Sequence, residues 1–193
     1  MLTQEVLDAA AADPGSPAWT AIRKAQAGVP LLLPWLARTA AGFDSRDRDG
    51  IVVLAGVLVV EATNEERETH RAEIARLKAF AAELLPTVSD DEDYVILRQA
   101  MLALDGDEVW GTWLDALNAG EIDVPCPECD EPLLYALTDD TIEPGLSSPL
   151  ATQLHTEALQ AGRSALAETL THLFGQVTCP ECATRFGLGD QVS

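Results

Sequence analysis

The stretches VPCPECDEPLLY (residues 124–135) and VTCPECATRFGL (residues 177–188) are two copies of one motif. They align at an offset of 53 residues and share an initial valine, two cysteines and the Pro-Glu pair between them. Alternating apolar residues follow each motif. The two copies contain all the cysteines of the chain, which are Cys126, Cys129, Cys179 and Cys182.

The spacing of these cysteines indicates metal binding. Two cysteines three positions apart on a tight turn, with backbone N–H groups directed at sulfur, present two thiolates to one ion. A second turn of the same kind completes a tetrahedron. In a reducing cytosol, paired C-x-x-C units bind a metal more often than they form disulfides. Unliganded or redox-active thiols are the alternative, but a redox C-P-x-C needs a helix directly after the motif.

The paired knuckles resemble those of the zinc-ribbon family, which commonly read C-P-x-C. The resemblance implies that all four cysteines bind one structural zinc ion. Four thiolates leave no open position for a water molecule, so a catalytic zinc is not expected. The chain departs from the family after the second cysteine of each knuckle. Family members often have glycine there, where a positive φ is convenient, whereas this chain has Asp130 and Ala183.

The predicted zinc ribbon spans residues 121–193 and is interrupted by a helical insertion at about 148–175. Forty-nine residues separate Cys129 from Cys179. Ser148 and Pro149 are typical of a helix start, and the sequence predicts one long helix from there to Phe174. Its apolar stripe is expected to consist of Leu159, Leu166, Leu170 and Leu173.

Residues 1–120 are predicted to form an α-helical domain, so the fold class is mostly α. Ten consecutive apolar residues at 51–60 include five valines, which favours a strand on propensity alone. We expect a buried helix there, because the neighbouring segments are all helical and a lone strand would have no partner. The expected helices lie at about 3–12, 16–27, 30–41, 51–60, 63–85, 89–104 and 109–119.

Local signals set the ends of these helices. Thr3 is a predicted N-cap, and Ser16 before Pro17 is another. Gly28 is expected to end the helix that begins at Ser16, and Pro30 is expected to begin the next helix. Two capping boxes are predicted, one at Thr63 and Glu66 and one at Ser89 and Glu92.

The helical part contains an internal echo. Residues 45–60 align with residues 89–104 at an offset of 44, and each copy follows a helix that contains Leu-Leu-Pro. A period near 44 lies in the range of HEAT and armadillo repeats, in which stacked helix pairs bury a common core. The pattern resembles a degenerate HEAT repeat over about residues 16–120. An irregular α-helical domain explains the same residues.

The charge is strongly acidic. The 193 residues contain 32 acidic and 12 basic side chains, which give a formal charge of −20. Direct binding to nucleic acid is not expected, because phosphates need Lys and Arg partners. Only two basic residues, Arg163 and Arg185, lie beyond residue 100. This charge suits a basic protein partner, or solubility alone.

We expect a soluble, cytoplasmic protein without a membrane segment. The N-terminal residues lack the basic start and continuous apolar run of a secretory signal. The most apolar stretch, residues 51–60, is about half the length that a membrane-spanning helix needs.

No catalytic residues are predicted. The spacing suggests no Ser–His–Asp or Cys–His set, and the chain has no glycine-rich phosphate loop. The histidines His70, His155 and His172 are expected to be structural. The four tryptophans are expected in the core, and any that is exposed becomes the best candidate for a partner contact. They are Trp19, Trp35, Trp110 and Trp113.

The leading functional hypothesis is a non-enzymatic, zinc-containing protein-binding or scaffold module with a basic partner. Two alternatives stay open. One is an accessory or small-molecule-binding helical domain with a pocket between helices. The other is an acidic mimic of nucleic acid that sequesters a DNA-binding protein.

Overall fold

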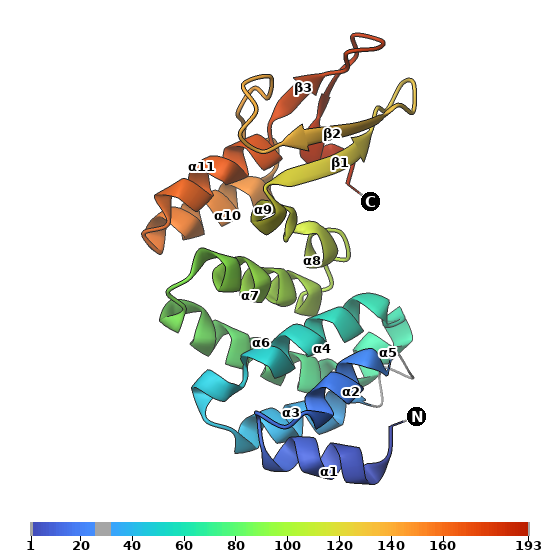
Figure 1. The fold of residues 1–193 in the computed structure, drawn as a ribbon, viewed down its shortest axis with the longest axis vertical. Helices are drawn as coiled ribbons and strands as arrows, with labels where there is room; N and C mark the ends of the chain where they lie inside the picture. Colours follow the sequence, from blue (N-terminus) through green and yellow to red (C-terminus); the bar gives the residue numbers. More distant parts are fainter. Residues whose placement is uncertain (1, 26–31, 193) are drawn as a thin grey trace. The chain divides into compact units, whose positions relative to one another are not determined.

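The computed structural model describes residues 2–25 and 32–192. The chain is mostly α-helical, as predicted, and it carries two small antiparallel sheets near the cysteines (Figure 1). It divides between Thr112 and Trp113 into two compact units, called here the first unit and the second unit. None of the described helices has both the length and the apolar character needed to cross a bilayer.

The first unit consists of helices connected by short turns. Its core is formed by apolar residues of α1, α2, α3, α4, α6 and α7. The α-helices are α1 (Gln4–Ala12), α2 (Ala18–Lys24), α3 (Leu33–Gly42), α4 (Asp49–Glu61), α5 (Asn64–Thr69), α6 (Arg71–Leu84), α7 (Asp91–Leu104) and α8 (Trp110–Trp113), with 3₁₀ turns at η2 (Ser45–Asp47) and η3 (Leu85–Thr87). The last residue of α8, Trp113, belongs to the second unit.

The apolar stretch at residues 51–60 lies in α4 and not in a strand, as predicted. Most of its side chains are buried, including Ile51, Val52, Leu58 and Val59. A helix that is apolar on all sides is stable only when it is enclosed by other helices. Here α4 contacts α3, α6 and α7, which outweighs the strand propensity of its valines.

The two copies of the internal echo contact each other. Gly56 of α4 and Ala100 of α7 are equivalent at the offset of 44, and a Cβ atom added at Gly56 would lie 2.9 Å from the Ala100 Cα. The backbones of the two helices therefore approach closely at one pair of equivalent positions. Each echo copy packs with the helix before it, α3 with α4 and α6 with α7.

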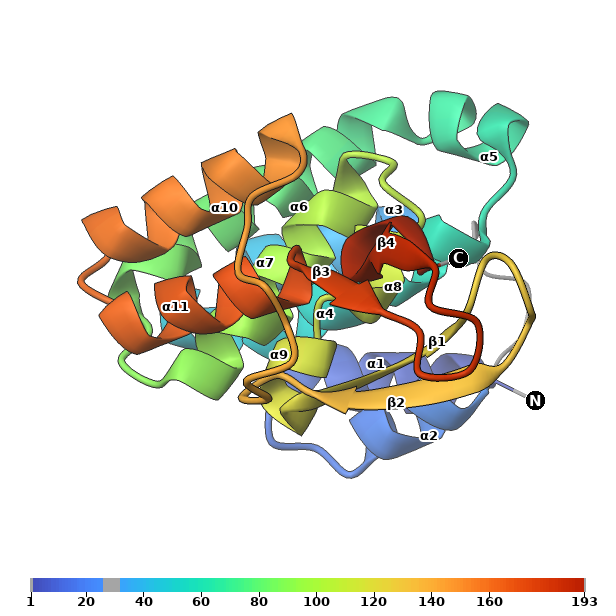
Figure 2. The ribbon, with the colours of Figure 1, turned by 90° about the horizontal axis from the view of Figure 1, so that it is seen from above.

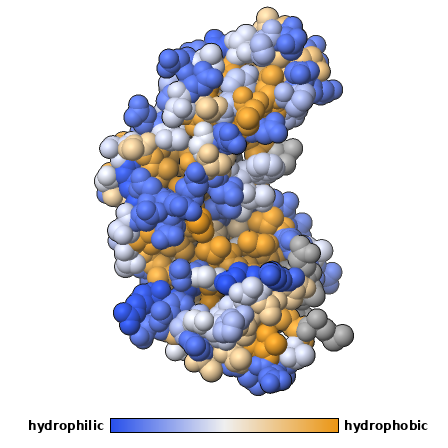
Figure 3. Space-filling view, in the orientation of Figure 1, coloured by the Kyte–Doolittle hydropathy of each residue, from blue (hydrophilic) through white to orange (hydrophobic). Residues whose placement is uncertain are grey.

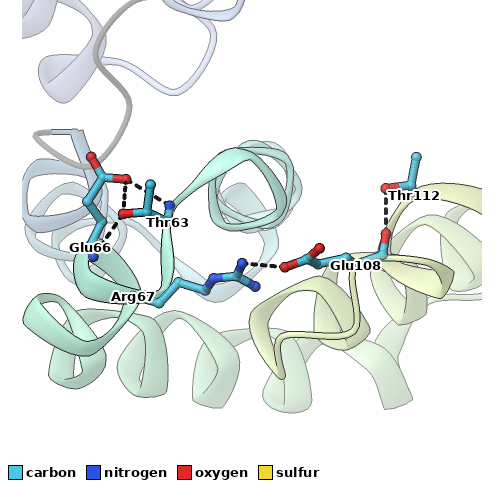
Figure 4. A network of polar contacts seen from close by, with 5 residues as sticks. All are labelled: Thr63, Glu66, Arg67, Glu108 and Thr112. Atoms are coloured by element: carbon cyan, nitrogen blue, oxygen red, sulfur yellow. Dashed lines mark hydrogen bonds and ion pairs between the residues drawn. The ribbon is translucent and has the colours of Figure 1, made fainter. Parts of the chain in front are cut away.

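Thr63 and Glu66 form the predicted capping box (Figure 4). Glu66 N donates to Thr63 Oγ1 at 3.3 Å, and Thr63 N donates to Glu66 Oε2 at 2.8 Å. The neighbouring Arg67 forms an ion pair with Glu108, which ties α5 to the turn before α8. The prediction of one helix over 63–85 was wrong, because the chain breaks at His70 (φ −104°, ψ 21°) between α5 and α6.

Two predicted helix starts of the first unit are confirmed, and one predicted helix end is corrected. Thr3 is an N-cap as predicted, and Ser16 Oγ accepts a hydrogen bond from Ala18 N at 3.3 Å, as predicted for a cap before Pro17. Helix α2 ends at Lys24, before the predicted end at about residue 27. The expected signals at Ala27, Gly28 and Pro30 lie outside the described residues.

The second predicted capping box was also wrong. Asp90, and not Ser89, is the N-cap of α7, where its side chain accepts hydrogen bonds from the backbone of Glu92 and Asp93. Both residues are of a cap-forming type and stand next to each other. A sequence pattern alone does not separate them by one position.

The second unit holds the two sheets and the helices α9, α10 and α11 (Figure 2). Strand β1 pairs with β2, and β3 pairs with β4. The elements are α9 (Ala116–Ala119), β1 (Glu121–Pro125), β2 (Pro132–Ala136), α10 (Pro149–Gln160), α11 (Ser164–Leu173), β3 (Gln176–Thr178), β4 (Arg185–Gly187) and the 3₁₀ turn η4 (Leu188–Asp190).

The insertion between the knuckles is a pair of helices and not the single helix that was predicted. Ser148 caps α10 as expected, and its Oγ accepts from Ala151 N at 3.0 Å. The chain then reverses at Gly162, whose φ of +75° ends α10, and α11 packs beside it (Figures 1 and 2). Leu159 was expected in the apolar stripe but is exposed, whereas Leu166, Leu170 and Leu173 are buried.

The predicted helix over residues 109–119 is likewise two short helices, α8 and α9. Gly120 ends α9 in the left-handed conformation (φ 71°), and its N–H donates to Ala116 O. This glycine cap leads the chain directly into β1. It thereby starts the hairpin that carries the first knuckle.

Candidate metal centre

Each knuckle is the turn of a β-hairpin. In the first, Cys126 comes directly after β1 and Cys129 stands in the turn before β2. Cys126 N donates to Glu131 O at 2.9 Å, and Asp130 N donates to Cys126 O at 3.0 Å. These two bonds close the turn and direct both sulfur atoms to the same side of it.

The second knuckle repeats this hydrogen-bond pattern at the aligned residues. Cys179 N donates to Thr184 O at 2.8 Å, and Ala183 N donates to Cys179 O at 3.0 Å. The strands on either side, β3 and β4, are shorter than those of the first hairpin. The similarity of the two sequences is therefore also a similarity of backbone structure.

The residue after the second cysteine has a positive φ in both knuckles. The value is 58° at Asp130 and 61° at Ala183, the two non-glycine residues with positive φ in the described chain. The sequence did not determine the turn type of the second knuckle, because alanine tolerates a positive φ less well than glycine or aspartate. The structure has the same turn at both positions, so Ala183 adopts an unfavourable backbone conformation to place Cys182.

The two knuckles bring the four sulfur atoms together. All lie within 4.8 Å of one another. Cys126 Sγ lies 3.6 Å from Cys182 Sγ, and Cys129 Sγ lies 3.8 Å from Cys179 Sγ. These distances exclude disulfides, whose sulfurs are about 2.05 Å apart. Four sulfurs bound to one zinc ion at about 2.3 Å would be about 3.8 Å apart in a regular tetrahedron.

The centre is half enclosed by protein. The first cysteine of each knuckle, Cys126 and Cys179, is buried, and the second, Cys129 and Cys182, is exposed. The valines that precede the knuckles, Val124 and Val177, are both buried. The apolar residues that follow lie on the strands or just beyond them. Of these Tyr135, Phe186 and Leu188 are buried.

The surroundings of the two exposed sulfurs shift their pKa values in opposite directions. The hydroxyl and the backbone N–H of Thr184 lower the pKa of Cys182 to about 6. A backbone hydrogen bond with Glu131 lowers the pKa of Cys129, but desolvation and hydrogen bonds with the other thiols raise it to about 12. Cys129 and Cys182 therefore do not ionise together by themselves, and a divalent cation between the sulfurs would offset the accumulated charge.

The donor set fits a structural metal ion. Four thiolates are the ligands that zinc takes in closed tetrahedral sites, and they leave no position for a substrate or an activated water. When bound, the ion would cross-link two hairpins whose cysteine pairs are separated by 49 residues of the chain. The residues that would hold it are the four predicted cysteines.

The other candidate ligands do not join the centre. His155 lies on α10 and His172 on α11, so the two predicted to share one helix are on separate helices. Within the described ranges, the four cysteines are the one group of Cys, His, Asp and Glu side chains placed to hold a metal ion. Glu131 and Thr184 were not among the predicted site residues. Each stands two residues after the second cysteine of its knuckle, and its backbone N–H bonds to that sulfur.

The tryptophans divide between core and surface. Trp19 and Trp110 are buried as predicted, and Trp35 is half-buried with its ring 5.4 Å from that of Trp19. Trp113 does not lie in the core, because 39% of its surface is exposed.

No family model, curated protein or solved structure matches this chain.

Proposed function

We propose that the second unit is a zinc-ribbon-like module in which Cys126, Cys129, Cys179 and Cys182 bind one structural zinc ion. The mutual approach of the four sulfur atoms within 4.8 Å carries this proposal. The two sheets of the unit have only two strands each, and such sheets are marginal alone. The zinc ion would therefore supply much of the stability of this region.

The chain as a whole acts, in this proposal, as a non-enzymatic protein-binding or scaffold module in the reducing cytoplasm. The closed four-thiolate set argues against metal catalysis. The packing of α3 with α4 and of α6 with α7 supports a HEAT-like interpretation of the first unit. Stacked helix pairs of that kind present an extended surface to partners. The formal charge of −20 favours a partner with a basic surface.

Affinity capture with the zinc-loaded chain from an extract of its native cells tests this function. Captured proteins are identified, purified and rebound to the chain at low and high salt. The proposal expects a basic partner whose affinity falls as salt rises. It is contradicted if no basic protein rebinds, or if binding ignores the salt concentration.

A pocket in the first unit favours a second candidate, a small-molecule-binding helical domain. The pocket has a volume of about 280 Å³ and lies where the two echo turns meet, between Asp49 and Asp93. Arg46 and Ser89 also line it. A thermal-shift screen with small zwitterions and amines tests this candidate. A compound whose stabilisation is lost in Asp93→Asn, but kept in Glu73→Gln, would support it.

A further inference from the structure

An exposed groove of the second unit combines apolar walls with an acidic rim. Trp113 and Leu134, which are 39% and 64% exposed, both line it. They are two of the four large apolar side chains exposed on the described chain. In the space-filling view, apolar surface over the β1–β2 hairpin is surrounded by hydrophilic residues (Figure 3). Exposed aromatic and aliphatic side chains that share one groove mark a binding surface.

Short elements on either side of Gly120 form the groove. Ala116 and Ala119 of α9 line one part, and the small size of these residues leaves the groove open beside Trp113. Ile122 of β1 also lines the groove and is buried. Leu134 reaches it from β2, where it pairs in register with Asp123. The groove is therefore formed by residues of α9, β1 and β2.

The rim is acidic. Asp115, Glu121 and Asp123 line the groove, and no basic residue does. The second unit has thirteen acidic residues and two basic ones, and the nearest such cation along the chain, Arg163, lies 29 positions after Leu134. A zinc ion bound by four thiolates would add about two negative charges to this unit.

We propose that this groove binds a peptide segment of a protein partner in which an aliphatic or aromatic side chain is flanked by Lys or Arg. This inference rests on the proposed function and names the chemistry that the partner presents. The anchor side chain would pack on Trp113 and Leu134, and the basic neighbours would pair with the rim carboxylates. Tryptophan is among the residues that contribute most to protein interfaces.

The charge and the size of the groove argue against other occupants. A second copy of the chain would bring a like-charged rim against the first, and anionic lipids or nucleic acids would be repelled in the same way. The groove has a volume of about 230 Å³, which is smaller than most pockets for drug-sized ligands. A single anchor side chain with flanking residues outside the groove fits this size.

Binding of labelled synthetic peptides to the zinc-loaded full chain tests the proposal. The peptides carry Leu, Phe, Trp or Ser at the centre and Lys/Arg, Gln or Glu in the flanks. Fluorescence anisotropy at low and high salt gives the affinities. We expect the apolar, basic peptides to bind at least tenfold more tightly than peptides with a central Ser or with Glu flanks.

Variants assign the binding to the groove. Trp113→Ala and Leu134→Ser should each weaken binding at least tenfold, and the combined Asp115→Asn, Glu121→Gln and Asp123→Asn variant should remove most of the salt dependence. Leu159→Ser and Glu168→Gln are matched controls, because both residues are exposed on the α10–α11 pair. Circular dichroism and zinc content verify that each variant folds. If Trp113→Ala misfolds, Leu134→Ser still tests the groove by itself.

The outcomes separate this inference from the proposed function. The groove proposal is overturned if no peptide binds, or if the Glu-flanked peptides bind as tightly as the Lys/Arg-flanked ones. It is also overturned if both Trp113→Ala and Leu134→Ser bind the peptides as tightly as the unchanged chain. If the groove variants still bind a basic partner isolated by affinity capture as tightly as the unchanged chain, the groove proposal is overturned and the proposed function stands. If the unchanged chain binds no basic partner, the proposed function itself is overturned.

Discussion

Gly56 and Ala100 stand at equivalent positions of two echoed segments and contact each other across the α4–α7 interface. A Cβ atom at Gly56 would lie 2.9 Å from Ala100 Cα and 3.2 Å from Ala100 O. Both are backbone atoms, which cannot rotate away. The side-chain hydrogen at position 56 is therefore a requirement of the helix packing.

Gly56→Ala should destabilise the first unit. Alanine favours a helix over glycine by about 0.5–1 kcal/mol, but overpacking against a backbone costs about 1–3 kcal/mol. We expect a net loss in the free energy of unfolding by urea. Gly50→Ala in the same helix is the control, since its Cβ would meet only Arg23 Nη1 at 3.8 Å. That variant should be neutral or more stable, and a stable Gly56→Ala would contradict the close packing.

Ala183→Gly should stabilise the zinc-loaded second unit. Alanine at a φ of 61° carries a cost that glycine avoids, so the gain is about 0.5–1 kcal/mol despite the entropy of glycine. Asp130→Gly should give a smaller gain, because aspartate tolerates this conformation.

Denaturant unfolding at saturating zinc measures both knuckle variants. Ala136→Gly, in strand β2, is the control and should lose stability. A loss of stability in Ala183→Gly as well would contradict the positive φ assigned to Ala183 in the second knuckle.

Removal of the metal should loosen the second unit and leave the first intact. All four predicted ligands belong to the second unit, and the first unit has its own apolar core. With a strong chelator, hydrogen exchange should accelerate in β1 and β3 by at least tenfold, while α4 and α7 keep their protection. Cys129→Ser and Cys182→Ser should behave like the chelated protein. Equal loss of protection in both units would contradict the division.

The capping box should contribute stability that depends on pH. The backbone and side-chain hydrogen bonds from Thr63 lower the pKa of Glu66 below its ordinary value of 4.5. A lowered folded pKa gives stability that is present above the ordinary pKa and is lost as pH falls through the folded pKa.

Comparison of Glu66→Gln with the unchanged chain isolates this contribution. The difference in unfolding free energy should be full at neutral pH and should vanish in acid. Glu65→Gln removes a carboxylate from the same helical turn without touching the capping box, and it serves as the control. A difference between the unchanged chain and Glu66→Gln that stays constant with pH would contradict the assignment.

The sequence predicted the metal centre because its signal is local. Each C-P-E-C turn is determined by neighbouring residues, and the repetition of the motif indicates that the two turns share an ion. The buried helix at α4 was also predicted, although its valines favour a strand, because a strand there would lack a partner.

The breaks at His70 and Gly162 were not predicted, since each lies inside a segment with helical periodicity. Whether such a residue continues or ends a helix depends on packing between distant segments, and α10 and α11 are separate because they pack on each other. Trp113 was assigned to the core by residue type, yet it lines an exposed groove. Residue type does not distinguish a tryptophan of the core from one of an interface.

The most direct test of the central claim is zinc K-edge X-ray absorption of the purified chain, combined with its metal content. We predict one zinc ion per chain, surrounded by four sulfur atoms at about 2.3 Å, and loss of that signal in a variant with both Cys126→Ser and Cys179→Ser. A protein that binds no stoichiometric zinc under reducing conditions, or one whose zinc has nitrogen or oxygen ligands in place of sulfur, would contradict it.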